Sequence, residues 1–172
     1  MESTEFKKIL FKTAFCVMAC DGNIDNSEIE EMKKIDTNTS YFNDMDLSAE
    51  LNQLIEGVKS KGKTLVKEFF ETIRVSELTI VQELLILEIS FRIISADNKI
   101  DENELKFLNL LRSKLNVDNE VLMDRFGNIP YFRNMNRSEI KDDSNSSEND
   151  FIQGINLPEI SALEAVKLKK EK

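Results

Sequence analysis

The sequence predicts an all-helical fold. It has 172 residues, of which only 5 are Gly and 2 are Pro. Its apolar residues recur at the 3.6-residue period of helices rather than at the two-residue period of strands. A chain of this length forms a single domain around one hydrophobic core. We therefore expect a compact bundle of about seven helices.

The first four predicted helices each carry one apolar face. The helix over residues 4–20 has the widest apolar face, and the helix over 26–36 is short. A polar loop leads to a third helix over 47–59, and the Lys-Gly-Lys turn at 61–63 separates it from a fourth over 64–74. Each apolar face is expected to lie against the core.

The fifth predicted helix is the central one. It covers about 77–96, with Ser76 as its expected N-cap. Its apolar residues run nearly all round the helix, and a helix of this kind in a water-soluble chain is buried. Glu88 and Arg92 lie four residues apart on its one charged strip, where we expect them to pair with each other.

Two shorter helices, over 102–115 and over 119–126, complete the expected helical domain of residues 1–137. Residues 138–150 hold five acids against one Lys and contain a single apolar residue, which is typical of a disordered, solvated linker. The tail over 151–172 is amphipathic and ends with four Lys residues. Such a tail is a docking segment for a partner protein, an eighth helix folded back on its own domain, or a frayed terminus.

Composition excludes several functions. The formal net charge of −9 argues against a protein that grips nucleic acid or an anionic membrane. The chain has no His, so imidazole bases, Ser-His or Cys-His pairs and His-containing zinc sites are absent. Cys16 and Cys20 are expected to be reduced core residues. We find no signal segment or apolar span and expect a cytoplasmic protein.

An internal repeat organises the chain. Residues 15–32 (FCVMACDGNIDNSEIEEM) align without gaps with residues 91–108 (FRIISADNKIDENELKFL) at an offset of 76. Each copy reads as the end of one helix, a tight turn and the start of the next helix. Gly22 and its equivalent Asn98 stand where the first helix of each copy ends, and Gly and Asn are the residues best able to take the left-handed cap conformation. The bundle is therefore expected to contain two similar helix-turn-helix units. Within each unit, an Asp and a Glu three residues later are placed to form a capping box, and these pairs are Asp25 with Glu28 and Asp101 with Glu104.

Asp21 and Asp97 have no such role. Each falls in the last turn of a helix, where the carbonyl end of the helix dipole repels a carboxylate. A divalent cation, a Lys or Arg of the domain, or a basic partner would each balance these charges. Residues 21–28 match the second part of an EF-hand loop, but Val17 and Ala19 would occupy its first and third ligand positions. We therefore do not expect a working EF-hand, whereas weak calcium or magnesium binding stays open.

The two phrases ACDGNIDNSEIEEM and SADNKIDENELKFL, each preceded by an apolar helix, resemble the tellurite-resistance TerB-like family. They are also similar to the N-terminal domain of DjlA-type co-chaperones, and the resemblance covers about residues 4–127. It implies a compact module of two similar helical units with a role in bacterial stress response or phage defence. Asn98 stands where the family usually has Gly, which weakens the match of the second turn. The resemblance also implies an acidic cluster suspected of binding divalent metal or partners: Asp21, Asp25, Glu28, Asp97, Asp101 and Glu104.

Several functional hypotheses follow. The leading one is a non-catalytic, acidic binding or adaptor module that holds a protein partner through its acidic turns or its tail. The alternative is a module that responds to a divalent cation, namely calcium, magnesium or manganese. A carboxylate- or metal-dependent enzyme subunit is the least supported, because the chain lacks a Gly-rich phosphate loop and a nucleophile with its base. We therefore expect no catalysis. The acids could also serve only as helix caps, with nothing bound.

Overall fold

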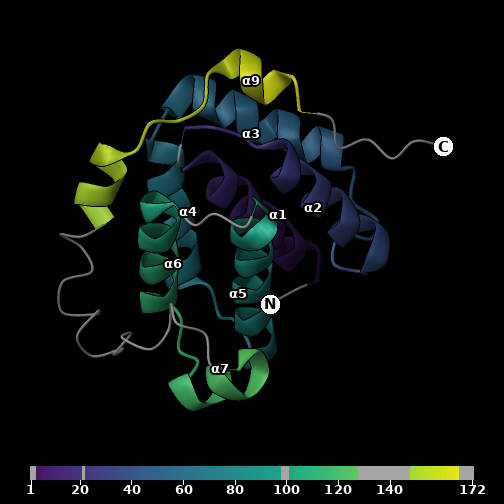
Figure 1. The fold of residues 1–172 in the computed structure, drawn as a ribbon, viewed down its shortest axis with the longest axis vertical. Coiled ribbons are helices and arrows are strands. Elements are labelled where there is room, and N and C mark those ends of the chain that lie inside the picture. Colours follow the sequence, from purple (N-terminus) through teal and green to yellow (C-terminus); the bar gives the residue numbers. More distant parts are fainter. Residues whose placement is uncertain (1–2, 21, 98–100, 128–147, 167–172) are drawn as a thin grey trace.

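A computed structural model describes residues 3–20, 22–97, 101–127 and 148–166, with the side chains of Ser3 and Asp97 not included (Figure 1). The prediction of an all-helical fold is confirmed, because these residues form helices and turns and contain no strand. None of the helices in these ranges is long and apolar enough to cross a membrane. In chain order the elements are α1 (Ser3–Ala19), α2 (Asn26–Asn38), α3 (Leu47–Lys61), α4 (Thr64–Val75), α5 (Ile80–Ile94), the short 3-10 helix η1 (Ser95–Asp97), α6 (Glu102–Ser113), α7 (Asn119–Phe126) and α9 (Ile160–Glu164). Residues 148–154 are also helical.

Helices α1 and α5 pack against each other at the centre of the bundle. Around this pair lie α4 and α6 on one side, α2 on the other and α3 across one end (Figure 1). Every residue of α1 from Phe15 to Ala19 is buried. The expected burial of the fifth helix is confirmed over most of its length, although its first two residues, Ile80 and Val81, are 54% and 66% exposed.

The start of α5 differs from the prediction. The helix begins at Ile80, and its N-cap is Thr79 rather than Ser76. The Thr79 hydroxyl accepts a hydrogen bond from the Gln82 N–H at 3.1 Å, and the Gln82 side chain accepts one from the Thr79 N–H at 2.9 Å. Ser76 instead ends α4, where its backbone N–H and its hydroxyl both donate to the Thr72 carbonyl. The intervening residues are needed to turn the chain between the two helices.

The expected pairing of Glu88 with Arg92 is wrong. The Glu88 carboxylate accepts hydrogen bonds from the Tyr41 hydroxyl and from Arg125, whereas Arg92 pairs with Glu31 at 2.9 Å. Both charged residues of α5 therefore bind other elements of the fold. These bonds tie α5 to α2, to α7 and to the loop that follows α2, which a pair within one helix could not do.

The C-terminal part of the chain packs on the domain. Of the expected linker 138–150, residues 138–147 lie outside the described ranges and 148–150 are helical. From there the chain passes back over the bundle to α9, which lies on α3 (Figure 1). Phe151, Ile155, Leu163 and Val166 are buried in the common core. The described part of the tail thus folds back on its own domain, and we call residues 148–166 the C-terminal strap.

Candidate functional site

The first acidic turn joins α1 to α2. Gly22 has φ +84°, a left-handed conformation that Gly adopts without the steric cost of a Cβ. Asp25 is the N-cap of α2, and Glu28 completes a capping box, with its Oε1 accepting from the Asp25 N–H at 3.2 Å. Asp25 is exposed and Glu28 is buried. Asp21, the residue that capping does not explain, lies outside the described ranges.

The second acidic turn uses the same device. Asp101 is the N-cap of α6, and its Oδ1 accepts from the Asn103 N–H at 2.7 Å. The Glu104 Oε1 accepts from the Asp101 N–H at 3.0 Å. Glu104 is buried and Asp101 is exposed, as in the first turn. Both capping boxes expected from the repeat are therefore confirmed. The side chain of Asp97 lies outside the described part of the chain.

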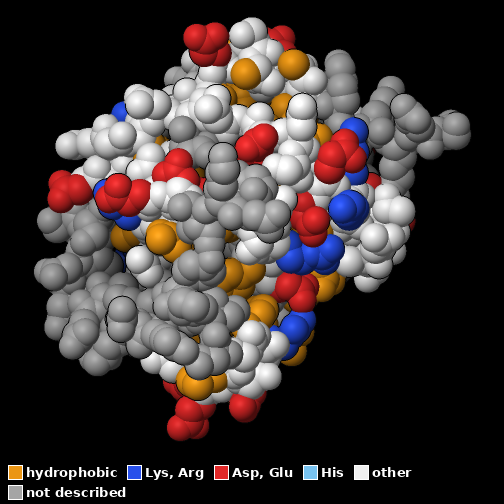
Figure 2. Space-filling view, viewed as in Figure 1, with side chains coloured by type: hydrophobic (Ala, Val, Ile, Leu, Met, Phe, Trp, Pro, Cys, Tyr) orange, Lys and Arg blue, Asp and Glu red, His pale blue; other side chains and the backbone are white. Residues whose placement is uncertain are grey.

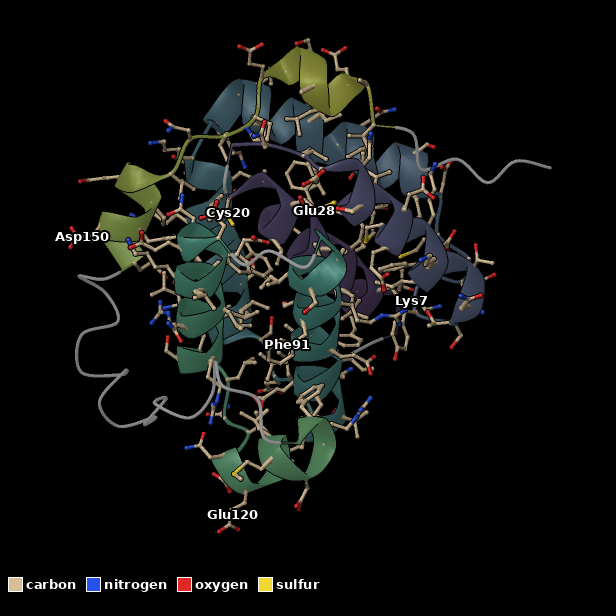
Figure 3. All side chains as sticks on the ribbon, viewed as in Figure 1. Lys7, Cys20, Glu28, Phe91, Glu120 and Asp150 are labelled. Atoms are coloured by element: carbon tan, nitrogen blue, oxygen red, sulfur yellow. The ribbon has the colours of Figure 1, made fainter. Side chains whose placement is uncertain are left out.

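Tertiary packing brings parts of the two units together. Helix α2, which follows the first turn, contacts η1, which begins the second turn. Figure 3 shows Cys20 and Glu28, the labelled residues on either side of the first turn, in the upper half of the molecule. The exposed Asp25 and Asp101 add negative charge to these turns.

Four of the six expected metal ligands have described side chains, and these four are the two capping pairs. Within the described residues, no three or more Asp, Glu, Cys or His side chains lie together in a way that could hold a metal ion. On the face shown in Figure 2, the acidic side chains are spread out and mixed with basic ones. A divalent cation at the acidic turns therefore stays a prediction that depends on Asp21 and Asp97.

The two thiols do not form a reactive site. Cys16 and Cys20 are buried and form no disulfide, as expected. Burial raises the pKa of Cys16 to about 12, although nearby Lys12 lowers it slightly. The Cys20 Sγ donates to the Val17 carbonyl at 3.2 Å. Because the nucleophilic form of Cys is the thiolate, the protonated Cys16 is an inert core residue.

Sequence reasoning missed Glu83, a buried acid in the first turn of α5. Its side chain is 2% exposed. Its carboxylate accepts from the Asn116 N–H at 2.7 and 3.0 Å and from the Val117 N–H at 2.9 Å. It thereby fixes the loop between α6 and α7 on α5. The only signal in the sequence was an acid at the start of an otherwise apolar run.

The C-terminal strap lies directly on the first turn. A Cβ built on Gly22 would lie 2.9 Å from the Asn156 carbonyl oxygen of the strap. This is closer than real Cβ atoms approach, so the backbone contact requires Gly at this position. Gly22 thus has two roles, one in ending α1 and one in making room for the strap. The repeat pattern predicted only the first role.

These features define a class of protein: a small all-helical domain built from two repeated helix-turn-helix units whose acids cap helices. The family model for tellurite resistance protein TerB matches residues 10–123, about two thirds of the chain. The chain belongs to the TerB family. No curated protein and no solved structure matches it significantly. The family match includes both acidic turns and ends before the C-terminal strap.

Proposed function

We propose that the protein is a non-catalytic binding module, an adaptor of a bacterial stress-response or phage-defence assembly, and that its acidic turns contact a basic surface of a protein partner. The TerB domain is a non-enzymatic helical fold, which supports a binding role. The observation that supports the proposal is the contact between α2, which follows the first acidic turn, and η1, which begins the second.

Electrostatics supports the choice of a basic partner. Asp25 and Asp101 are exposed, and both belong to a chain of net charge −9. Complementary charge accelerates the encounter of two proteins, and salt weakens the attraction of exposed charges beyond about 8 Å at physiological ionic strength. Binding through these turns is therefore expected to weaken as salt concentration rises.

A pair of matched variants tests the adaptor. Asp25→Asn with Asp101→Asn removes two exposed charges but keeps residues that cap helices well. Glu77→Gln with Glu120→Gln removes two exposed charges elsewhere. Each immobilised full-length protein is used to capture partners from cells that express it natively. We expect the Asn variant to lose a partner that the wild type and the Gln variant retain. Equal capture by all three proteins contradicts a role for the turns.

A cation-responsive module is the second candidate. Its support is the same contact between α2 and η1. Carboxylates of the two turns that lie close together would repel one another, and a divalent cation would relieve that repulsion. A cation that binds only the folded protein and is present at a free concentration of 100 times its Kd stabilises the folded state by about 2.7 kcal/mol. Thermal unfolding with added calcium, magnesium or manganese measures this effect. The hypothesis requires a stabilisation that Asp21→Asn with Asp97→Asn abolishes, and it fails if the wild type shows none.

We place the module in the cytoplasm, because Cys residues that form no disulfide, such as Cys16 and Cys20, are typical of reducing compartments.

A further inference from the structure

The C-terminal strap covers an apolar face of the TerB domain. The Phe151 ring lies 6.4 Å from the Phe70 ring of α4 and 6.3 Å from the Phe107 ring of α6, between ring centroids. Ile155 and Leu163, further along the strap, are fully buried. The strap therefore inserts an aromatic anchor and two aliphatic anchors into the domain.

Contacts of Lys side chains also join the domain to the strap. The strap contains four acidic residues and no Lys or Arg. Lys114, whose side chain is 4% exposed, pairs with Glu148 of the strap at 2.9 Å. Lys59 lies 3.7 Å from Glu164, and the Lys63 Nζ donates to the Gln153 carbonyl at 2.8 Å. Although the whole protein is acidic, the face beneath the strap therefore presents Lys side chains to an acidic segment.

The strap lies outside the part of the chain that matches the family model. The family match ends at residue 123, and the strap begins at 148. Six domain residues with a described contact to the strap fall within the matched range: Gly22, Lys59, Lys63, Phe70, Phe107 and Lys114. The matched domain thus has a face with both apolar and basic side chains, and the strap covers this face.

We propose that this face is a binding site for an acidic amphipathic segment of a partner protein, and that the strap occupies it in cis until such a segment displaces it. The segment is expected to carry an aromatic anchor, an aliphatic residue four positions later and acids that reach the Lys residues, as in Phe151, Ile155 and Glu148. A tethered strap acts at an effective concentration of about millimolar. It therefore blocks weak ligands and admits only a partner that binds more tightly. Of the domain residues named above, only Gly22 belongs to an acidic turn, so this face can fail as a binding site while the adaptor proposal holds.

The test begins with the full chain carrying a protease site within 138–147. Cleavage leaves residues 148–172 attached only by non-covalent contacts. A labelled synthetic peptide of residues 148–166 is then added to cut and uncut protein, and its binding is followed by fluorescence anisotropy. We expect the cut protein to stay folded and exchange its fragment for the peptide, and the uncut protein to bind the peptide far more weakly.

Peptide variants test the anchors without changing the domain. Phe151→Ala in the peptide is expected to weaken binding roughly 30- to 100-fold, as for a buried aromatic hot spot. Glu148→Gln is expected to weaken it about tenfold or more, because it leaves the buried Lys114 without its carboxylate. Ser161→Ala, at an exposed position, should change it by less than about twofold.

Four results overturn the proposal. Unfolding of the cut protein would show that the strap is an essential part of the core. Failure of the fragment to exchange at about 1 mM peptide would show that the strap does not leave the domain. Equal binding of the wild-type and Phe151→Ala peptides shows that the peptide does not use this face. If the intact protein forms a dimer that a Phe151→Ala variant loses, a second copy of the chain, rather than a partner protein, occupies the face.

Discussion

Replacing Glu83 by Gln keeps the size and shape of the side chain, but we expect it to destabilise the fold strongly. The two carboxylate oxygens accept from the backbone N–H groups of Asn116 and Val117 at 2.7 to 3.0 Å. Gln offers one acceptor oxygen and turns an NH2 group toward a backbone donor. A hydrogen bond to a charged group contributes about 1.5–3 kcal/mol, and a buried donor left unsatisfied costs about 1–3 kcal/mol. We therefore expect Glu83→Gln to lower the free energy of unfolding by about 2–3 kcal/mol.

Urea unfolding followed by far-UV circular dichroism measures this loss. For a chain of this size the same change lowers Tm by about 4 to 12 °C. Glu77→Gln is the control, because Glu77 is exposed just before the start of α5 and its substitution should change stability by less than about 0.5 kcal/mol. Faster hydrogen exchange at the Asn116 and Val117 amides would locate the effect. If Glu83→Gln and Glu77→Gln unfold at the same urea concentration, the buried carboxylate does not hold the loop.

Three further predictions concern the turns and the core. Gly22→Ala should lower Tm more than Gly127→Ala, because both residues have positive φ but only at Gly22 does a Cβ meet another atom, the Asn156 carbonyl oxygen; equal losses would argue against the strap contact. The Cys16 thiol should lower the free energy of unfolding by about 1.4 kcal/mol per pH unit between about pH 9 and 12, because the unfolded thiol loses its proton before the buried one does. Urea midpoints of Cys16→Ala across this range should lack that contribution, and identical slopes would refute it. Asp101→Ala should lower the free energy of unfolding by about 1 kcal/mol, whereas Asp101→Asn should keep wild-type stability if Asp101 acts as a helix cap. Chemical denaturation of both variants tests this.

Local features of the fold could be read from the sequence. The helices followed from apolar periodicity, and both capping boxes followed from an Asp and a Glu three residues apart. The helix after 75 was placed three residues too early, because Ser76 and Thr79 are both acceptable N-caps. Only the Gln three residues after Thr79 completes a capping box, and this favours the later start.

The candidate site was only partly predictable. The capping roles of Asp25 and Asp101 were foreseen, as was the left-handed conformation of Gly22. The backbone of Asn156 against Gly22 was not foreseen, because the two residues are far apart in the sequence. The sequence also left open whether the tail docks on a partner or folds back, and the structure decided between them. An amphipathic pattern predicts a buried face but does not say which protein buries it.

By itself the sequence determined that this protein is an all-helical bundle built on a duplicated turn, with the family resemblance that the TerB match confirms. These properties depend on contacts between residues three or four positions apart, and composition and spacing report such contacts directly. Only the tertiary structure decided that Glu88 and Arg92 pair elsewhere, that Glu83 anchors a loop, and that an acidic strap covers a basic face. Those outcomes depend on which helix faces meet, and that is set by the packing of the whole core rather than by any local run of residues.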